Sequence, residues 1–429
     1  MIRDLVSYDE SVQGLLRMIR KGDEMEYITR NIEQDFMKAS QTHKAVVVTG
    51  ADQIGKTTMM KHLSEGRKRT YVSLGDLHPR TLADTDPDLF FEIFKPPIII
   101  DEAHFVPSIL HKIKELCLES DEMGQFWIAC TPKIAYIKEV KKIMGKKAAV
   151  LNMYGLSLDE RKRRAAADPE FSFKAITARE QSLGKIHFTD MSRYIWRGGL
   201  PQVSDLDQED KAKYFWHYFH ESLMHQVKQT KKVRLLTQFS DFLSACAVNI
   251  CQVLSIRQVA LAAGVSCPTA TIWLQILVDL GIVYMLEPYQ SKKVKRLVRK
   301  PKLYFTDTGF CSYISNWKTP KALMQGREAD AYFENFVVME LVKKLANRGG
   351  VKLKFIRTSS GTDVNVVIIQ AGKAHPFAIR KTAAPKQSIL RKFEAIDSIA
   401  DTRDGGIICT CKEVKRMDEK NYLLPCHLL

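Results

Sequence analysis

A short segment around residue 50 constrains the fold more than any other part of this chain. Residues 44–58, KAVVVTGADQIGKTT, contain the spacing G-x-x-x-x-G-K-[ST], which runs here from Gly50 to Thr57. The β-branched run before Gly50 is typical of a buried strand, and the residues after Thr57 continue with helical spacing. A glycine-rich loop between a strand and a helix N-terminus binds phosphate, because amide N–H groups and the helix dipole both favour an anion there. The segment therefore predicts a P-loop and a nucleoside triphosphate site.

The P-loop also predicts which residues hold the nucleotide. Lys56 is expected to reach the β- and γ-phosphates and to assist catalysis, and the Thr57 hydroxyl is expected to bind Mg2+. We favour ATP over GTP because the sequence has no evident N-K-x-D motif for reading guanine. The expected cofactors are ATP and Mg2+. The predicted nucleotide-binding residues are Gly50, Ala51, Asp52, Gln53, Ile54, Gly55, Lys56, Thr57 and Thr58.

A second apolar strand brings acidic residues to the same site. The run PPIIIDEAH, residues 96–104, contains Asp101 and Glu102 directly after three isoleucines. Asp101 is expected to bind Mg2+, and Glu102 is expected to orient and deprotonate the attacking water. The alternative is that both acids are merely solvated at the end of a strand. The letters DEAH also name a class of helicases, but the helical pattern after residue 160 leaves no room for the second lobe of such enzymes.

A further strand, FWIACTP at residues 126–132, ends in Thr131. We expect Thr131 to sense the γ-phosphate from the neighbouring strand and so to take part in catalysis. The alternative is that Thr131 only terminates the strand.

Strands and helices alternate between about residues 43 and 155, which predicts a parallel sheet with helices on both faces. Residues 157–250 have a helical pattern, and residues 251–315 contain short helices, a basic segment and a strand. After about residue 325 a long helix precedes alternating strands. The predicted fold is α/β and multidomain, in line with a length of 429 residues. The expected domains are residues 1–155, 156–320 and 321–429.

The chain is strongly basic, with a formal net charge of +16 and an isoelectric point near 9.3. Such a charge is the electrostatic footprint of many polyanion binders. Seven basic residues and one acid lie in EPYQSKKVKRLVRKPK, residues 287–302, so DNA is a candidate partner through the basic segment 292–302. The alternative is a basic surface with no specific partner.

The apolar runs, the N-terminal residues and the cysteines of the sequence indicate where the protein is located and whether its thiols are reduced. No run of 18 apolar residues occurs, so no membrane partner is expected, and the N-terminus MIRDLVSYDESVQ has no apolar signal region. The expected location is the cytoplasm. The nine cysteines are odd in number and fit reduced thiols. Cys409 and Cys411 form a C-x-C pair in a strand-like setting, and we favour buried thiols over a metal site there.

From about residue 20 to its end the chain resembles a family of prokaryotic AAA-like ATPases, the archaeal-ATPase group. The matching pieces occur in the family's order: GADQIGKTT, IIIDEAHFVP, GLSLDE at 155–160, YIWRGGLPQV at 194–203, KLYFTDTGF at 302–310 and AYFENFVVMEL at 331–341. The resemblance implies a P-loop ATPase domain, a helical and winged-helix middle, and a C-terminal α/β domain of the restriction-endonuclease type whose role is not known.

One departure from the family pattern concerns a catalytic arginine. The family usually has a Gly-Arg pair before the GLSLDE-like stretch, whereas here Gly145 is followed by Lys146. A lysine supplies a point charge where arginine supplies a planar fork, and an arginine finger is worth roughly 10^3 to 10^5 in rate. If the arginine contacts the γ-phosphate, the resemblance implies slow ATP hydrolysis.

The stretch LSIRQVALAAGVSCPTATIWLQILVDLGIV, residues 254–283, looks like a winged helix with a turn at Gly264. Outward residues of such helices can read DNA bases, while basic wing residues contact phosphates. Winged helices in this family also serve as protein-interaction or autoinhibitory modules, so a protein partner and an oligomer stay open. The expected packing residues are Val259, Ala262, Val265, Ile272, Ile276 and Leu280, and the expected outward residues are Ser266, Thr269, Thr271 and Gln275. The wing candidates are Lys292, Lys293, Lys295, Arg296, Arg299 and Lys300.

The C-terminal part lacks the metal ligands of restriction-type nucleases. Such sites need an Asp on one strand and a Glu-x-Lys on the next. The aligned positions hold Asn365, Ala378 and Arg380. Glu334 and Asp363 are acidic but do not occupy the paired positions. We therefore predict a nuclease-like fold without nuclease activity.

Three functions fit these patterns. The leading hypothesis is a Mg2+-dependent ATPase that acts as a nucleotide-dependent switch coupled to the winged helix and the C-terminal domain. The second is a DNA-binding or defence-related regulator in which ATP binding matters more than hydrolysis. The third is a scaffold with a vestigial P-loop.

Overall fold

The computed structural model describes residues 26–164, 173–182, 186–290, 297–358, 361–397 and 400–429. The chain divides into two compact units. The first, called here the P-loop unit, consists of Tyr27–Ala165 and Leu277–Ile282. The second, called the C-terminal unit, takes in Ala166–Ile276 and Val283–Leu429. Within the described residues no single helix is long and apolar enough to cross a membrane; only α14 (Ile256–Ala262) and α15 (Cys267–Asp279) taken together, which meet at 98°, would pass that test.

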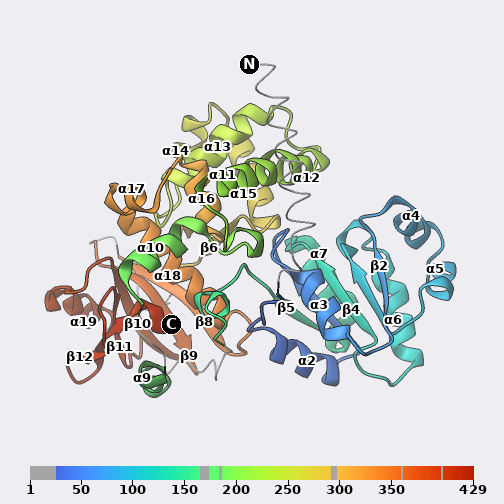
Figure 1. The fold of residues 1–429 in the computed structure, drawn as a ribbon, viewed down its shortest axis with the longest axis horizontal. Coiled ribbons are helices and arrows are strands. Elements are labelled where there is room, and N and C mark those ends of the chain that lie inside the picture. The colour runs from blue at the N-terminus through green and yellow to red at the C-terminus, as the bar shows by residue number, and fades with distance from the viewer. Residues whose placement is uncertain (1–25, 165–172, 183–185, 291–296, 359–360, 398–399) are drawn as a thin grey trace. The chain divides into compact units, whose positions relative to one another are not determined.

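The P-loop unit is built on a sheet of five parallel strands in the order β2-β3-β4-β1-β5 (Figure 1). Because all five strands run in one direction, the residues that follow them lie along the same edge of the sheet. The predicted α/β core with a parallel sheet is therefore confirmed. The strands are β1 (Ala45–Thr49), β2 (Thr70–Ser73), β3 (Ile98–Asp101), β4 (Phe126–Cys130) and β5 (Ala148–Asn152).

Strand β5 did not stand out in the sequence. It reads AAVLN, pairs only with β1 in the sheet, and has one buried residue, Leu151. An edge strand of this kind needs no strong apolar run, so its pattern is weak.

Helices cover both faces of the parallel sheet. On one face Ile100 and Ile128 pack with residues of α5 and α6, including Phe90 and Ile113. On the other face Trp127 meets Phe36 of α2 edge-to-face, with ring centroids 4.8 Å apart, and its indole N–H donates to Ser40 Oγ at 2.8 Å. The helices are α2 (Glu33–Thr42), α3 (Lys56–Ser64), α4 (Leu77–Thr85), α5 (Pro87–Ile93), α6 (Ile109–Glu119), α7 (Ile134–Met144) and α8 (Leu158–Arg161).

The first half of the C-terminal unit is helical, as predicted. A two-stranded antiparallel hairpin of β6 (Val283–Leu286) and β7 (Lys302–Phe305) follows its central helices. The helices are α9 (Phe173–Ser182), α10 (Phe188–Arg197), α11 (Gln208–His217), α12 (Met224–Gln229), α13 (Leu236–Val248), α14 (Ile256–Ala262), α15 (Cys267–Asp279), α16 (Thr308–Ile314) and α17 (Pro320–Gln325). The last three residues of α15 belong to the P-loop unit.

The predicted packing of α14 and α15 is wrong at two positions. Ala262 is exposed, and Ile272 is 46% exposed. The indole of Trp273, which we had not included, is buried against Phe239 and Phe242 of α13 at centroid distances of 5.4 and 5.7 Å. Ile272 and Trp273 are neighbours on the helix, so only one of them can face the core, and the larger aromatic side chain buries more apolar area.

A mixed sheet of six strands forms the rest of the C-terminal unit, in the order β12-β13-β11-β10-β9-β8. Strands β8, β9 and β10 pair antiparallel, whereas β11 pairs parallel with both β10 and β13. The elements are α18 (Ala329–Leu345), β8 (Val351–Arg357), β9 (Asp363–Gln370), β10 (Lys373–Arg380), α19 (Arg391–Asp397), β11 (Gly405–Cys409), β12 (Lys415–Arg416) and β13 (Asn421–Pro425).

All nine cysteines are free thiols, and all but Cys267 are buried. Cys409 ends β11, and a hydrogen bond from the Cys411 thiol lowers the pKa of Cys409. The described residues contain no group of three or more His, Cys, Asp or Glu residues placed to hold a metal ion. Eight of the nine cysteines, Cys409 and Cys411 among them, are buried, whereas Cys267 is exposed.

Candidate nucleotide-binding site

The P-loop follows β1 and adopts a backbone that favours glycine. Gly55 has φ +91° and precedes Lys56, the first residue of α3. A side chain in this left-handed conformation would be strained, so glycine is required here. Gln53 also has a positive φ, +61°, and its N–H donates to Asp52 Oδ1 at 2.8 Å. The loop thus contains two residues with positive φ within three positions.

The side chain of Lys56 is folded over this loop. It is only 5% exposed, and its ammonium donates to the carbonyl oxygens of Gly50 and Ala51 at 3.0 and 2.7 Å. The charge is therefore held at the mouth of the loop, where phosphates are expected.

A hydrogen bond joins the P-loop to the end of β3. Thr57 Oγ1 donates to Asp101 Oδ2 at 2.6 Å, and Tyr71 Oη donates to the same oxygen at 3.2 Å. The other carboxylate oxygen of Asp101 accepts from the Glu102 N–H at 3.0 Å. The two side chains predicted to bind Mg2+ are thus in direct contact.

Glu102 lies beside Asp101 in an unusual backbone conformation, with φ +53°. Burial raises the pKa of the Glu102 carboxyl to about 7, with the negative charge of Asp101 adding to the shift and Lys56 opposing it. A carboxyl with this pKa can exchange a proton near neutral pH, as a general base must.

His104, which the sequence reasoning did not assign, connects Glu102 to Thr131. Its Nδ1 lies 3.3 Å from Glu102 Oε2 and accepts from the Thr131 N–H at 3.4 Å. Burial lowers the pKa of His104 to about 3, and the nearby cations Lys133 and Lys56 add to the shift. The imidazole is therefore neutral at physiological pH. The DEAH sequence places His104 near Glu102 in the chain, but it does not predict the contact of His104 with Thr131.

Thr131 follows β4, which lies between β3 and β1 in the sheet. The residue is 3% exposed, and its Oγ1 has no hydrogen-bond partner among the described residues. A buried hydroxyl without a partner is costly unless a ligand supplies one. With Lys56, Thr57 and Asp101 at the same edge, this donor set fits a magnesium-bound triphosphate.

A buried ion pair that the sequence reasoning missed braces the P-loop. Arg30 donates to the carbonyl oxygens of Ile54 and Tyr154 at 2.7 and 2.6 Å, and to Glu160 Oε1 at 3.1 Å. Glu160 also accepts from the Ser157 N–H in a capping box at the start of α8. The spacing S-x-x-E in GLSLDE was the readable signal, but nothing local pointed to Arg30.

Lys146 lies at the end of the sheet opposite to the P-loop, too far away to contact a γ-phosphate bound to its own chain. It belongs to the turn Gly145–Lys147 before β5, and β5 runs parallel to β1 with Ala148 beside Ala45. The P-loop follows the other end of β1. Replacement of the family's arginine by Lys146 therefore cannot weaken a contact with the γ-phosphate of the same chain, and the expected slow hydrolysis does not follow from such a contact.

The acidic residues of the C-terminal unit surround a buried lysine. Lys302 of β7 is 1% exposed, and its ammonium lies 3.2 Å from Asp363 Oδ1 and 3.7 Å from Glu334 Oε1. Glu334 also accepts from Tyr304 Oη at 2.8 Å and from the Asn365 amide at 2.6 Å. Burial and the charge of Asp363 raise the pKa of Glu334, against the effect of Lys302.

This network corrects the predicted basic segment 292–302. Lys302 cannot contact DNA because it is buried and its ammonium pairs with two carboxylates. Arg299 and Lys300 are exposed, whereas Lys292, Lys293, Lys295 and Arg296 lie outside the described residues.

The aligned nuclease positions are engaged with one another. Asn365 Oδ1 accepts from the Ile379 N–H and from Arg380 Nη1, each at 3.1 Å. Ala378 is 2% exposed and contributes to the core under the sheet. The Asn365 carboxamide thus contacts Arg380 through its oxygen and Glu334 through its nitrogen.

Three family models match separate parts of the chain. Residues 42–162 match an AAA domain, residues 188–321 match a domain of unknown function (DUF8612), and residues 329–429 match a second domain of unknown function (DUF4143). The first match identifies an AAA-family P-loop ATPase domain around the site described above.

Uncharacterized proteins of Mycobacterium tuberculosis and Mycobacterium bovis are each 23% identical to this chain over 359 residues, which is 83% of this chain and 75% of theirs. Among solved structures, a Walker-type ATPase of Pyrococcus abyssi aligns over 68% of this chain and 97% of its own, with 11% identity and a TM-score of 0.42. The RuvB Holliday junction branch migration motor of Thermotoga maritima aligns over 62% of this chain and 93% of its own, with 13% identity and a TM-score of 0.32.

Proposed function

We propose that this chain is a Mg2+-dependent ATPase that acts as a nucleotide-dependent switch. The observation that carries the proposal is the 2.6 Å hydrogen bond from Thr57 Oγ1 to Asp101 Oδ2. It joins the loop expected to hold phosphate to the strand end expected to hold the metal. The match of residues 42–162 to an AAA domain supports the same activity.

Each group at this edge has a role in the proposed reaction. Lys56 holds the phosphates, Thr57 and Asp101 hold Mg2+, and Glu102 takes a proton from the attacking water. Mg2+, when bound, neutralises negative charge that develops on the phosphate oxygens. Thr131 senses the γ-phosphate through its buried hydroxyl, and His104 Nδ1 positions the Thr131 backbone by accepting from its N–H.

We further propose that the nucleotide state controls a winged helix and a nuclease-like domain. The order α13, α14, α15 and the hairpin β6–β7 supports the winged helix. The carboxamide of Asn335 on α18 accepts from the Phe305 N–H and donates to the Phe305 carbonyl, both at 2.8 Å. Together with the Lys302 ion pairs, these bonds tie β7 to α18 and β9, so residues 156–320 and 321–429 would move together near this hairpin.

The second candidate function is a DNA-binding regulator in which ATP binding alone matters. The exposed Arg299 and Lys300 beside the hairpin favour it. In either case we propose no nuclease activity, because Lys302 already supplies the positive charge that faces Asp363 and Glu334.

Phosphate release tests both functions. The purified protein is assayed with ATP and with GTP, with and without double-stranded DNA, at two salt concentrations, beside Lys56→Ala. The proposal predicts release from ATP that Lys56→Ala abolishes. DNA stimulation that collapses with salt would indicate phosphate contacts by the basic segment. Equal phosphate release by wild type and Lys56→Ala would overturn the proposed ATPase.

A further inference from the structure

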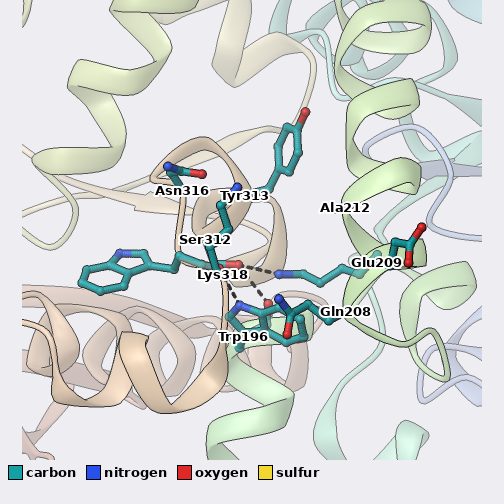
Figure 2. A pocket seen from close by; sticks show the side chains of 10 residues that line it. Trp196, Gln208, Glu209, Ala212, Ser312, Tyr313, Asn316 and Lys318 are labelled. Carbon is teal, nitrogen blue, oxygen red and sulfur yellow. Dashed lines mark hydrogen bonds between the residues drawn. The ribbon is translucent and has the colours of Figure 1, made fainter. Parts of the chain in front are cut away.

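The C-terminal unit contains a pocket of about 340 Å³ that lies away from the acidic network around Lys302. Its walls come from α10, α11, α16 and the segment that follows α16. Figure 2 shows Trp196, Ser312 and Tyr313 around the pocket, with Asn316 and Lys318 near its edge. The volume is at the lower end of the range for small-molecule sites, and the walls carry aromatic rings that could hold a flat ligand.

A buried lysine lies in the wall of this pocket. Lys211 of α11 is 3% exposed, and its ammonium donates to Ser312 Oγ at 2.8 Å. The same ammonium lies 3.6 Å from the ring centroid of Trp196. Ser312 is itself held in place, because its hydroxyl lies within hydrogen-bond reach of the Trp196 and Gly309 carbonyl oxygens, at 2.9 and 2.8 Å.

Lys211 has no acidic partner in the described part of the chain, since no carboxylate there lies within ion-pair distance of its ammonium. Asp307 attracts it only from further away, and that carboxylate accepts from the Phe310 and Gly199 amides. Glu209, which also lines the pocket, pairs with Lys213 at 2.7 Å. The remaining charged groups near Lys211 are cations, Arg197 and Lys318.

Burying an ammonium without a counter-ion costs free energy of folding, and replacing it by an apolar side chain is often neutral or stabilising. Such a group is therefore a candidate for binding an anion. Burial lowers the pKa of Lys211 to about 7, with Arg197 adding to the shift and Asp307 opposing it. The missing partner is one negative charge, and the aromatic walls leave room for an apolar body beside it.

We propose that this pocket binds a small organic carboxylate, whose anion pairs with Lys211 and whose flat apolar part lies against Trp196, Tyr313 and Trp317. A single ammonium matches a carboxylate, which carries one negative charge. The Lys211 ammonium has three donors, of which Ser312 uses one, so it can also donate to the carboxylate. The inference does not depend on the proposed ATPase activity, because none of these residues belongs to the P-loop unit.

The proposal makes the affinity depend on pH in a defined direction. The anion binds the protonated amine, so the ligand raises the pKa of Lys211 and binding takes up a proton. Affinity is therefore full below the pKa of the free pocket and falls by up to about tenfold per pH unit above it. Glu209 and Lys318 are the other charged side chains that line the pocket.

Calorimetric titration with benzoate and indole-3-acetate tests the site, with benzamide as an uncharged probe of the same shape. The full chain is titrated about one pH unit below and one above the pKa of Lys211, together with Lys211→Met and the matched control Lys228→Met, an exposed lysine of α12 that does not line the pocket. We expect at least one carboxylate to bind wild type and Lys228→Met, more tightly at the lower pH, and benzamide not to bind.

Thermal melting of the same variants separates a site from a structural lysine. Lys211→Met keeps the buried alkyl chain but removes the ammonium, with its hydrogen bond to Ser312 and its contact with Trp196. The variant should still melt cooperatively and should lose carboxylate binding. The proposal is overturned if neither carboxylate binds wild type, if benzamide binds equally well, or if folded Lys211→Met still binds the carboxylate. Unchanged phosphate release in Lys211→Met would show that the ATPase is independent of this pocket.

Discussion

The hydroxyl of Thr57 and the carboxylate of Asp101 are joined by a 2.6 Å hydrogen bond, although 44 residues separate them in the chain. The bond places both proposed metal ligands on one edge of the parallel sheet. It also fixes the Thr57 rotamer before a nucleotide arrives, which reduces the entropy that binding must overcome.

Asp101→Asn should raise the Mg2+ concentration needed for phosphate release. The amide keeps the size of the side chain but loses the negative charge, so metal affinity should fall by roughly 10- to 100-fold or more. A Mg2+ titration of phosphate release measures the change. Asp88→Asn, at an exposed ion pair on α5, is the matched control and should leave the titration unchanged.

Phosphate release should depend on the ionisation of Glu102. Its carboxyl has a pKa of about 7 and must be deprotonated to accept a proton from water. In the free enzyme kcat/KM should therefore rise with pH through about 7 and then level off. A profile that is flat between pH 6 and 8 would contradict the role of Glu102.

Glu102→Gln should separate ATP binding from hydrolysis. We expect the rate to fall by about 10^2 to 10^4, the usual contribution of a general base. Binding should persist, because the P-loop is intact, and ATP at about 100 times its dissociation constant should still add about 2.7 kcal/mol of stability. Melting with Mg-ATP checks this, and a vestigial P-loop would show no shift in wild type either.

Breaking the brace between Arg30 and Glu160 should destabilise the P-loop unit. Arg30→Met leaves a buried carboxylate unpaired, which typically costs about 3–5 kcal/mol. Arg30→Met with Glu160→Gln should recover part of this loss in denaturant unfolding. Although burial alone would raise it, the pKa of Glu160 is lowered by Arg30 and by backbone N–H groups. The stability that this carboxylate contributes is therefore present above its unfolded pKa and lost as the pH falls through the folded value.

Lys302→Met alone should lower the free energy of unfolding more than a double variant in which Asp363 is also replaced. The single change leaves Glu334 and Asp363 facing each other without a cation, at a cost of about 3–5 kcal/mol. Lys302→Met with Asp363→Asn should unfold at a higher denaturant concentration than Lys302→Met.

Wild type should not cleave DNA with Mg2+ or Mn2+, and metal-dependent cleavage lost in Asp363→Ala would contradict the inactive site.

Local sequence pattern determined much of the P-loop unit. The β-branched runs before Gly50 and Asp101 specify buried strands, and the glycine spacing of the loop is a requirement of its backbone. These features depend on neighbours within a few residues, so they are readable without a fold. The α/β class, the helical middle and the strands after α18 were predictable for the same reason.

Contacts between distant segments were decided only by the tertiary structure. The sequence shows that Arg30, Lys146 and Lys302 are basic, but it does not show what they contact. The packing of the elements decides that Arg30 braces the P-loop, that Lys146 lies at the opposite end of the sheet, and that Lys302 is buried between carboxylates. The reason is physical: periodicity reports which face of an element is apolar, whereas the partner across that face depends on how the elements pack.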